Sequence, residues 1–274
     1  MALVRRPGER LAEGLVTHLE RTPVDPGLAA EQHAAYVAAL AAAGWRVVEV
    51  EPAPEHPDAV FVEDTVVVID DLAVLTHSGA PQRRGEIAGT RDAVTRLGLR
   101  VVDLGDAAPA GAHPTLDGGD VLQVGDRVYV GRGGRTDADG VRALRALLAP
   151  LGRTVVPVPL VDVLHLKSAV TALPDGTLVG LPRLLDAAVL PGLRVAPEEP
   201  GAHVVPLGES RLLMAASAPR SAALFDDLGF DVVTVDIGEF EKLEGCVTCL
   251  SVLVPAAALA KAGQTNSSVA PSAS

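Results

Sequence analysis

Four residues of types that can do chemistry occupy the same place in a repeated pattern of the sequence. Asp64, Asp117, His165 and Cys249 each stand just ahead of the first strand of a predicted hairpin. Together they offer a thiol nucleophile, an imidazole that can carry protons, and two carboxylates. They are spread over most of the chain, so they predict one shared site only if the fold gathers equivalent positions of the repeat.

Taken singly, each of these residue types has an ordinary structural interpretation. An aspartate ahead of a strand, such as Asp58, Asp117 or Asp120, is usually a turn or cap residue. A lone histidine is usually hydrogen-bonded in the core or on the surface, and a buried cysteine such as Cys246 is usually inert. The recurrence at one position of the repeat is what favours a functional interpretation.

The spacing C-x-x-C at residues 246–249 is also typical of dithiol exchange or of half a zinc site. A thioredoxin-type pair opens a helix, whereas this one leads into the apolar run at residues 250–254. A structural zinc site needs a second pair, and the chain has only two cysteines. We therefore predict no metal site.

The elements that must position these residues form a repeat of a hairpin, a helix and a single strand. Paired apolar runs around tight turns predict hairpins at residues 66–69 with 73–76, 121–124 with 128–131, 169–173 with 178–181, and 204–207 with 212–215. Helical patterns follow at residues 86–97, 137–151, 184–189 and 220–228, and single strands at 100–104, 154–158, 193–195 and 231–235.

A fifth copy of the unit is split between the two ends of the chain. Residues 29–43 and 46–50 predict its helix and single strand, and residues 250–254 and 2–4 supply the hairpin pair. Closing the ring in this way leaves no open sheet edge at the seam. We therefore expect an α/β fold, a five-bladed pseudo-symmetric α/β propeller in residues 1–255. Residues 256–274 are rich in small residues, and we expect a largely disordered tail there.

The composition excludes several classes of function. The 274 residues include 23 Lys and Arg against 35 Asp and Glu, and the net charge of −12 repels nucleic-acid phosphates. No uninterrupted apolar run is long enough to predict a membrane span. Residues 1–20 carry charges in place of an apolar signal core, and two cysteines cannot build a disulfide framework. We expect a cytoplasmic protein that binds neither nucleic acid nor membrane.

Six segments of the chain match one known family. They are FVED at residues 61–64, QRRGE at 82–86, LDGGD at 116–120, GRTDADG at 134–140, LHLKS at 164–168 and GCVTC at 245–249. In this combination, residues 2–254 resemble the dimethylarginine dimethylaminohydrolases of the guanidino-modifying pentein superfamily. FVED-type and LDGGD-type segments also recur in arginine deiminases of the same superfamily. The resemblance implies the same five-bladed propeller.

The resemblance also implies a role for each site residue. It implies that Cys249 is the nucleophile, that His165 is the general acid and base, and that Asp117 hydrogen-bonds this histidine. The substrate-binding residues that it implies are Leu15, Asp58, Phe61, Glu63, Asp64, Arg83, Arg135 and Leu243. In this assignment, the carboxylates of Glu63 and Asp64 hold the substrate guanidinium, and Asp58 pairs with the substrate α-amino group. Arg83 and Arg135 hold the substrate α-carboxylate. Leu15 and Leu243 offer backbone carbonyls from a lid and a rim.

The implied activity is hydrolysis of Nω-methylated arginine to citrulline and methylamine or dimethylamine, through a covalent thiouronium on Cys249. This scheme needs no cofactor, its partner is a small molecule, and the resemblance is compatible with a homodimer. Three alternatives stay open: a hydrolase or deiminase of arginine or another guanidino compound, a non-catalytic binder of guanidino amino acids, and a redox or zinc module at the two cysteines. Cys246 stands where relatives often carry Gly, and we hypothesise an oxidative disulfide with Cys249.

Overall fold

Fifteen short strands form five three-stranded sheets in the computed structural model, which describes residues 1–268 and the side chains of residues 1–264. In each sheet the first strand runs antiparallel to the second, and the second runs parallel to the third. The sheets, in this strand order, are β15 (Val252–Leu253), β1 (Ala2–Val4) and β2 (Val47–Glu49); β3 (Val66–Ile69), β4 (Leu72–Leu75) and β5 (Arg100–Asp103); β6 (Val121–Val124), β7 (Arg127–Arg132) and β8 (Thr154–Pro159); β9 (Val170–Ala172), β10 (Leu178–Gly180) and β11 (Arg194–Val195); and β12 (Val205–Pro206), β13 (Arg211–Ala215) and β14 (Asp231–Val235).

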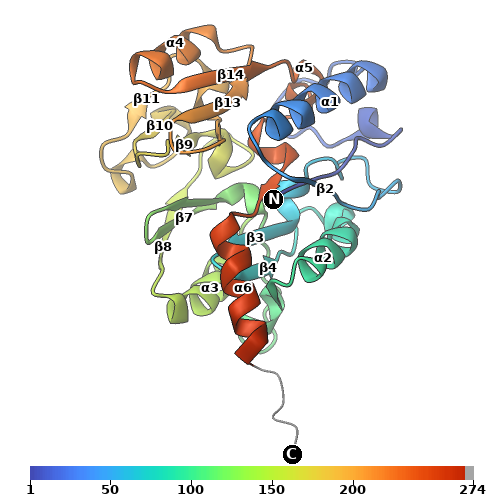
Figure 1. Cartoon of the computed structure of the whole chain (residues 1–274), viewed down its shortest axis with the longest axis vertical. Coiled ribbons are helices and arrows are strands. Elements are labelled where there is room, and N and C mark those ends of the chain that lie inside the picture. The colour runs from blue at the N-terminus through green and yellow to red at the C-terminus, as the bar shows by residue number, and fades with distance from the viewer. Residues whose placement is uncertain (269–274) are drawn as a thin grey trace, which may run out of the picture.

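A helix connects the second strand to the third in four of these five units. Figure 1 shows these helices on the outside of the ring of sheets. They are α1 (Pro26–Ala42), α2 (Ile87–Arg96), α3 (Ala138–Leu148) and α4 (Pro219–Asp227). The unit of β9 to β11 has two single 3₁₀ turns, η8 (Pro182–Leu184) and η9 (Ala187–Val189), where the sequence predicts a short helix.

The ring closes by pairing the two ends of the chain. Strand β1 pairs antiparallel with β15, with Ala2 opposite Leu253, and parallel with β2. The amino group of Met1 donates to the carbonyl of Val254 at 2.7 Å. The split fifth unit and the α/β propeller are thus confirmed.

The C-terminal segment differs from its predicted disorder. Helix α6 (Ala256–Ser268) runs down the front of the molecule in Figure 1, while residues 269–274 lie outside the described part of the chain. Ala258 and Ala262, one helical turn apart, are buried against a cluster that includes Leu3 and Val94. Alanine favours helices intrinsically, and its small side chain lets the helix approach the core closely. The prediction failed because it required large apolar residues for a buried face.

A buried arginine fixes the first unit to the chain that leads into the site. Arg5, only 1% exposed, donates hydrogen bonds to the carbonyl oxygens of Glu51, Ala59 and Glu86 at 2.8 to 3.0 Å. Three buried backbone acceptors are thereby satisfied by one side chain, which positions these loop segments.

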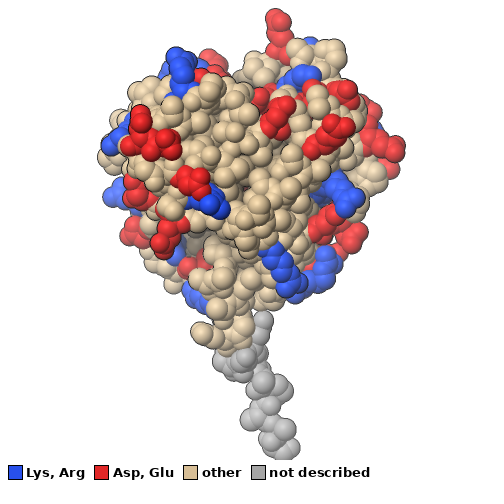
Figure 2. Space-filling model, turned by 45° about the horizontal axis from the view of Figure 1, so that its top comes forward, with Lys and Arg blue, Asp and Glu red and all other residues tan. Residues whose placement is uncertain are grey.

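One face of the molecule carries charged side chains of both signs. On the face shown in Figure 2, acidic and basic side chains are interspersed around a largely uncharged centre. Within residues 1–268, no helix is long and apolar enough to cross a membrane.

Candidate active site

A single 3₁₀ turn leads into the first strand of each unit that carries a predicted reactive residue. Asp64 lies in η2 (Val62–Thr65), and Cys249 lies in η11 (Thr248–Leu250). Asp117 immediately precedes η5 (Gly118–Asp120), and His165 immediately precedes η7 (Leu166–Ser168). Turn η2 contacts η11 and η5, and η5 contacts η7. The propeller thus gathers the equivalent positions at one end of its axis.

His165 lies between two buried carboxylates that come from two other units. Its Nε2 atom is 3.1 Å from Oδ2 of Asp117 and 3.8 Å from Oδ1 of Asp64. All three residues are at most 3% exposed. Backbone amides complete the cluster, because Gly79 donates to Asp117 at 3.1 Å and Gly119 donates to Asp64 at 2.9 Å. The structure therefore brings three of the four reactive residues into direct proximity.

The charges of this cluster determine its protonation. Burial alone would lower the pKa of His165, because it disfavours the charged imidazolium. Asp64 and Asp117 outweigh burial and raise the pKa of His165 to about 9. Burial likewise opposes ionisation of Asp64, but His165 and Arg83 lower the pKa of Asp64 below its usual range. At neutral pH the imidazole is therefore protonated and Asp64 is ionised.

Glycine at position 119 is required by the close approach of the two side chains. A Cβ atom there would lie 2.8 Å from Oδ1 of Asp64 and 2.8 Å from Nδ1 of His165. Such distances are far below ordinary van der Waals contact, so a larger residue would displace one of the two side chains. The LDGGD segment therefore supplies a carboxylate and makes room for its partners.

Arg83 is committed to acceptors of the protein itself. Its Nη1 atom is 2.7 Å from Oδ2 of Asp64, and its Nε and Nη2 atoms donate to Glu86 at 2.8 to 3.2 Å. Nη2 also meets the carbonyl oxygens of Asp58 and Phe61 at 3.3 Å. Arg83 thus holds Asp64 in place, and its predicted role toward a substrate carboxylate stays a prediction.

Arg135 and Asp58 flank the same cluster. Nη1 of Arg135 makes a long contact of 3.4 Å with Oδ2 of Asp117. The carboxylate of Asp58, only 5% exposed, accepts the backbone N–H of Leu15 at 3.0 and 3.2 Å. Burial raises the pKa of Asp58, while Arg83 and Arg135 act in the opposite direction. A buried acid and a buried guanidinium are therefore available for the two charged ends of an amino acid.

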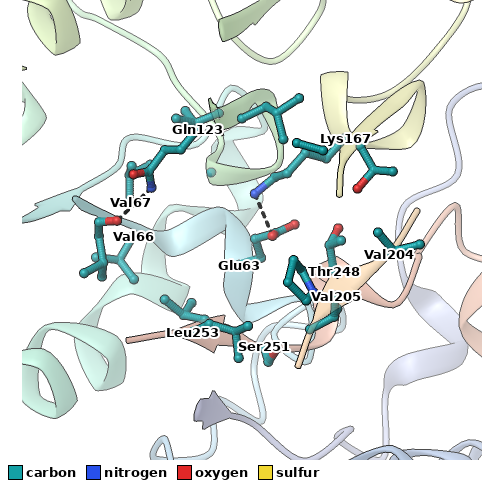
Figure 3. A pocket seen from close by; sticks show the side chains of 18 residues that line it. Glu63, Val66, Val67, Gln123, Lys167, Val204, Val205, Thr248, Ser251 and Leu253 are labelled. Carbon is teal, nitrogen blue, oxygen red and sulfur yellow. Dashed lines mark hydrogen bonds and ion pairs between the residues drawn. The ribbon is translucent and has the colours of Figure 1, made fainter. Parts of the chain in front are cut away.

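Glu63 faces a different space from its neighbour Asp64. Its side chain points into a central cavity of about 250 Å³ that is lined by the first strands of the units (Figure 3). Lys167 Nζ lies 2.6 Å from Oε1 of Glu63, whereas the buried Oε2 has no hydrogen-bond partner in the described part of the chain. Burial raises the pKa of Glu63 to about 7, although Lys167 opposes this shift. The two adjacent carboxylates therefore have different partners.

Cys249 lies beside the turn that carries both carboxylates. It is 5% exposed, and its Sγ atom is 3.2 Å from Sγ of Cys246. The backbone N–H of Cys246 also donates to this sulfur at 3.4 Å. Among residues 1–264, no hydrogen bond joins Cys249 to His165. The thiol is thus placed by its own turn and by Cys246.

The segment around Leu15 is held over the site by Glu244. The carboxylate of Glu244 accepts the backbone N–H groups of Thr17 and Leu19 at 3.0 and 2.9 Å, and also that of His18. Leu243, the preceding residue, is buried close to Gly14, whose added Cβ would lie 3.3 Å from it. Leu15 and Leu243 therefore belong to one rim.

A second cavity lies beside this rim. A cavity of about 320 Å³ is lined by residues that include His18, Leu164, His203, Glu244 and Gly245. The backbone of Gly245 also packs closely against Phe61, because a Cβ atom at position 245 would lie 2.3 Å from the phenyl ring. Phe61 in turn packs edge-on against Phe240, with ring centroids 6.3 Å apart. Phe61 therefore supports the cysteine segment from the apolar side.

The cluster of Asp64, Asp117 and His165 also has the spacing of a cation site. One ligand atom from each residue lies within 4.8 Å of the others. However, both oxygens of Asp64 and both oxygens of Asp117 already accept hydrogen bonds from the protein. His165, Arg83 and Arg135 supply positive charge next to these carboxylates. That the site binds no metal stays a prediction.

Comparisons with known proteins decide the family. No protein-family model matches the chain. The dimethylarginine dimethylaminohydrolase of Streptomyces coelicolor is 62% identical over 252 residues, which cover 92% of this chain and 95% of the relative. The enzyme of Pseudomonas aeruginosa is 32% identical over 255 residues, which cover 91% and 97%. The chain belongs to the dimethylarginine dimethylaminohydrolase family.

Solved structures of this family agree with the fold. The complex of Pseudomonas aeruginosa dimethylarginine dimethylaminohydrolase with citrulline has a TM-score of 0.82 at 31% identity, and the match covers 92% of this chain and 97% of that one. The N-terminal domain of a cyanobacterial arginine dihydrolase has a TM-score of 0.79 at 20% identity, which concerns the fold alone. As a member of this family, the chain is a pentein propeller and a hydrolase of carbon–nitrogen bonds.

Sequence reasoning missed three residues that support this dimethylarginine dimethylaminohydrolase site. Lys167 pairs with Glu63, and Glu244 holds the segment around Leu15. Asp120, which was interpreted as a turn residue, accepts the backbone N–H of Leu166 at 2.9 Å and thereby orients the segment of His165. Asp120 and Lys167 stand within the matching LDGGD and LHLKS segments, which was the available signal.

Proposed function

We propose that this chain hydrolyses asymmetric dimethylarginine and monomethylarginine to citrulline, with Cys249 as nucleophile and His165 as proton carrier. The observation that carries the proposal is the buried cluster of His165, Asp64 and Asp117 beside the turn of Cys249. It combines a protonated imidazole with buried carboxyl groups, of which Asp64 is ionised, and this suits a cationic substrate. The predictions of a cytoplasmic location and of a homodimer stay predictions.

The guanidinium of the substrate would reach Glu63 from the side of the central cavity and Asp64 from the side of His165. The unpartnered Oε2 of Glu63 is costly to bury and would gain a donor from the guanidinium. Asp64, ionised at neutral pH, would support the positive charge that makes the guanidinium carbon electrophilic. Asp58 would take the α-ammonium group, and Arg135 the α-carboxylate, with Arg83 adding positive charge nearby. These anchors fix the distance to the reacting carbon.

The chemistry would proceed in two halves. The resting Cys249 is a thiol, because the contact with Cys246 raises its pKa. With the cationic substrate beside it, Cys249 loses its proton to solvent and the thiolate attacks the guanidinium carbon. His165 then gives its proton to the departing methylamine or dimethylamine, which leaves a thiouronium on the sulfur. The now neutral His165 takes a proton from water as this water attacks the same carbon. The carbon–sulfur bond then breaks, the second proton of this water passes to the sulfur, and citrulline leaves. Both the thiol and the protonated imidazole are thereby restored. A pKa of about 9 for His165 suits the first half, because the acid must be protonated at neutral pH.

The test is citrulline production from asymmetric dimethylarginine, monomethylarginine and arginine at equal concentration, with Cys249→Ser as the blank. We expect turnover of both methylated substrates and none by the blank, whose fold is checked by its thermal unfolding midpoint. Turnover of arginine alone would refute the proposed substrates and leave the family intact. Undiminished turnover by Cys249→Ser would refute the nucleophile.

A further inference from the structure

The two cysteines of the chain form a contact that the proposed hydrolysis does not use. Sγ of Cys246 lies 3.2 Å from Sγ of Cys249, and both residues are at most 5% exposed. They are the only cysteines in the 274 residues. Hydrolysis needs one thiol, so the second thiol calls for a separate explanation.

We propose that Cys246 is a resolving thiol, which captures an oxidised Cys249 as a disulfide and makes the dithiol a reversible oxidation site for hydroperoxides. The backbone supports this chemistry, because the N–H of Cys249 donates to the carbonyl of Cys246 at 3.1 Å and closes a tight turn. Such a turn keeps the two Cα atoms within about 7 Å, which is close to the span that a disulfide bridges. The sulfurs need to approach by only about 1.2 Å to reach bonding distance.

The surroundings of the pair favour a thiolate. The hydroxyl of Thr248 lies 3.1 Å from Sγ of Cys246, and the N–H of Cys246 points at Sγ of Cys249. The contact with Cys249 lowers the pKa of Cys246, and the same contact raises the pKa of Cys249. One proton shared by two sulfurs leaves the other sulfur nucleophilic, as a resolving cysteine requires.

The oxidation balances with a hydroperoxide as the named oxidant. One sulfur takes an oxygen atom from the hydroperoxide, whose O–O bond breaks and releases water or an alcohol. The second sulfur then attacks this sulfenic sulfur and displaces the oxygen as water, so two protons and two electrons leave the pair. A thiol reductant reverses the reaction by exchange. Without Cys246, the sulfenic acid would proceed to sulfinic acid, which thiols do not reduce.

The experiment treats the whole chain, Cys246→Ser and Cys246→Ala with hydrogen peroxide, and then divides each sample with and without thiol reductant. Peptide mass mapping after alkylation reports the state of each sulfur. In the wild type we expect a linked 246–249 peptide that has lost two hydrogen atoms, and an activity loss of about tenfold or more that the reductant restores. In both variants we expect oxygen on Cys249 and a loss that the reductant does not restore. Each variant is compared with its own untreated sample.

Two results would overturn the proposal. One is wild-type protein in which Cys249 carries oxygen while Cys246 remains alkylatable. The other is a loss in Cys246→Ser that is as reversible as in the wild type. Only the activity readout rests on the proposed function, since the mass readout needs no substrate. A linked peptide in a chain that does not hydrolyse methylarginine would therefore refute the function and leave the oxidation site standing.

Discussion

Two histidines of this chain are equally deep in the protein and have opposite acid–base character. His33 in α1 is 4% exposed, lies edge-on to Phe240 at 6.4 Å, and its Nε2 atom has no hydrogen-bond partner in the described part of the chain. Burial lowers its pKa to about 4. His165 is 2% exposed, yet its pKa is raised to about 9.

The comparison shows that burial sets the direction of a histidine's pKa shift only where no nearby negative charge offsets the cost of burying the imidazolium. Around His33 burial disfavours the imidazolium and the charge of Arg6 acts in the same direction, so the ring is neutral at pH 7. Around His165 the 3₁₀ turns of two other units present Asp64 and Asp117, and these carboxylates outweigh the same penalty. A pseudo-symmetric ring is suited to this, because each unit can contribute one charged residue to a common point.

Removing the charge of Asp117 should have the largest effect on kcat, because it removes part of the difference in pKa between His165 and His33. Asp117→Asn keeps the shape of the side chain but cannot stabilise the imidazolium, so the pKa of His165 should fall toward the behaviour of His33. We expect kcat to fall by about 10²- to 10⁴-fold, the range of a lost general acid–base contribution. Steady-state kinetics with asymmetric dimethylarginine measures this. Asp103→Asn is the matched control, because Asp103 pairs with His77 at 2.6 Å away from the cluster. Equal losses in both variants would contradict the assignment.

Displacing Asp64 or His165 without removing a charge should lower kcat by a smaller factor. In Gly119→Ala the new Cβ would lie 2.8 Å from both Asp64 and His165, and one of them must move. We expect kcat to fall by about 10²-fold, as for a misplacement of roughly 1 Å. Gly208→Ala is the control, since nothing lies within 4 Å of a Cβ there. Wild-type kcat in Gly119→Ala would show that the close approach is dispensable.

The sequence predicted the meeting of these residues and, through the family resemblance, the contact of Asp117 with His165, but not the separate partners of Glu63 and Asp64. Equivalent positions in a closed ring must converge, which is why Asp64, Asp117 and His165 could be grouped beforehand. Within η2, however, Glu63 and Asp64 are adjacent and face different spaces, and no periodicity decides which of them meets Lys167. The pairing depends on side-chain direction within a 3₁₀ turn.

Helix α6 shows the same limit in the fold. Its fully buried residues are Ala258 and Ala262, with Leu259 partly buried beside them, so a pattern that looks for several large apolar residues does not register this face. The hairpins of the repeat were recognised because β-branched runs and turn residues are local signals. The packing of a small-residue helix depends instead on the space that the other units leave.

Because His33 is neutral in the folded protein, the free energy of unfolding should fall at acidic pH. The unfolded state binds a proton at His33 near pH 6.5 and the folded state only near pH 4, so the stability that the neutral ring contributes is present above pH 6.5 and is lost as pH falls toward 4. Between pH 7 and pH 5, the free energy of unfolding of the wild type should fall by about 2 kcal/mol relative to His33→Gln. The difference between the two proteins is the relevant quantity, because Glu63, whose pKa is raised to about 7, titrates in the same range with opposite sign.

Denaturant unfolding at the two pH values measures this difference. His113→Gln serves as the control, because His113 is exposed. If wild type and His33→Gln lost the same free energy, the apolar surroundings of His33 would not control its protonation.

The charged histidine should limit activity on the alkaline side. Since the proton of His165 leaves as pH rises through about 9, kcat for asymmetric dimethylarginine should fall about twofold between pH 8 and pH 9. The fall should depend on the leaving group, because an amine must be protonated to depart whereas a thiolate need not be. S-methyl-L-thiocitrulline, which forms an adduct with a histidine-to-glycine variant of a dimethylarginine dimethylaminohydrolase, provides that contrast. With this substrate we expect kcat to stay level over the same range. An equal decline with both substrates would show that the titrating group is not the acid that protonates the departing amine. The contrast between the two histidines would then concern stability alone.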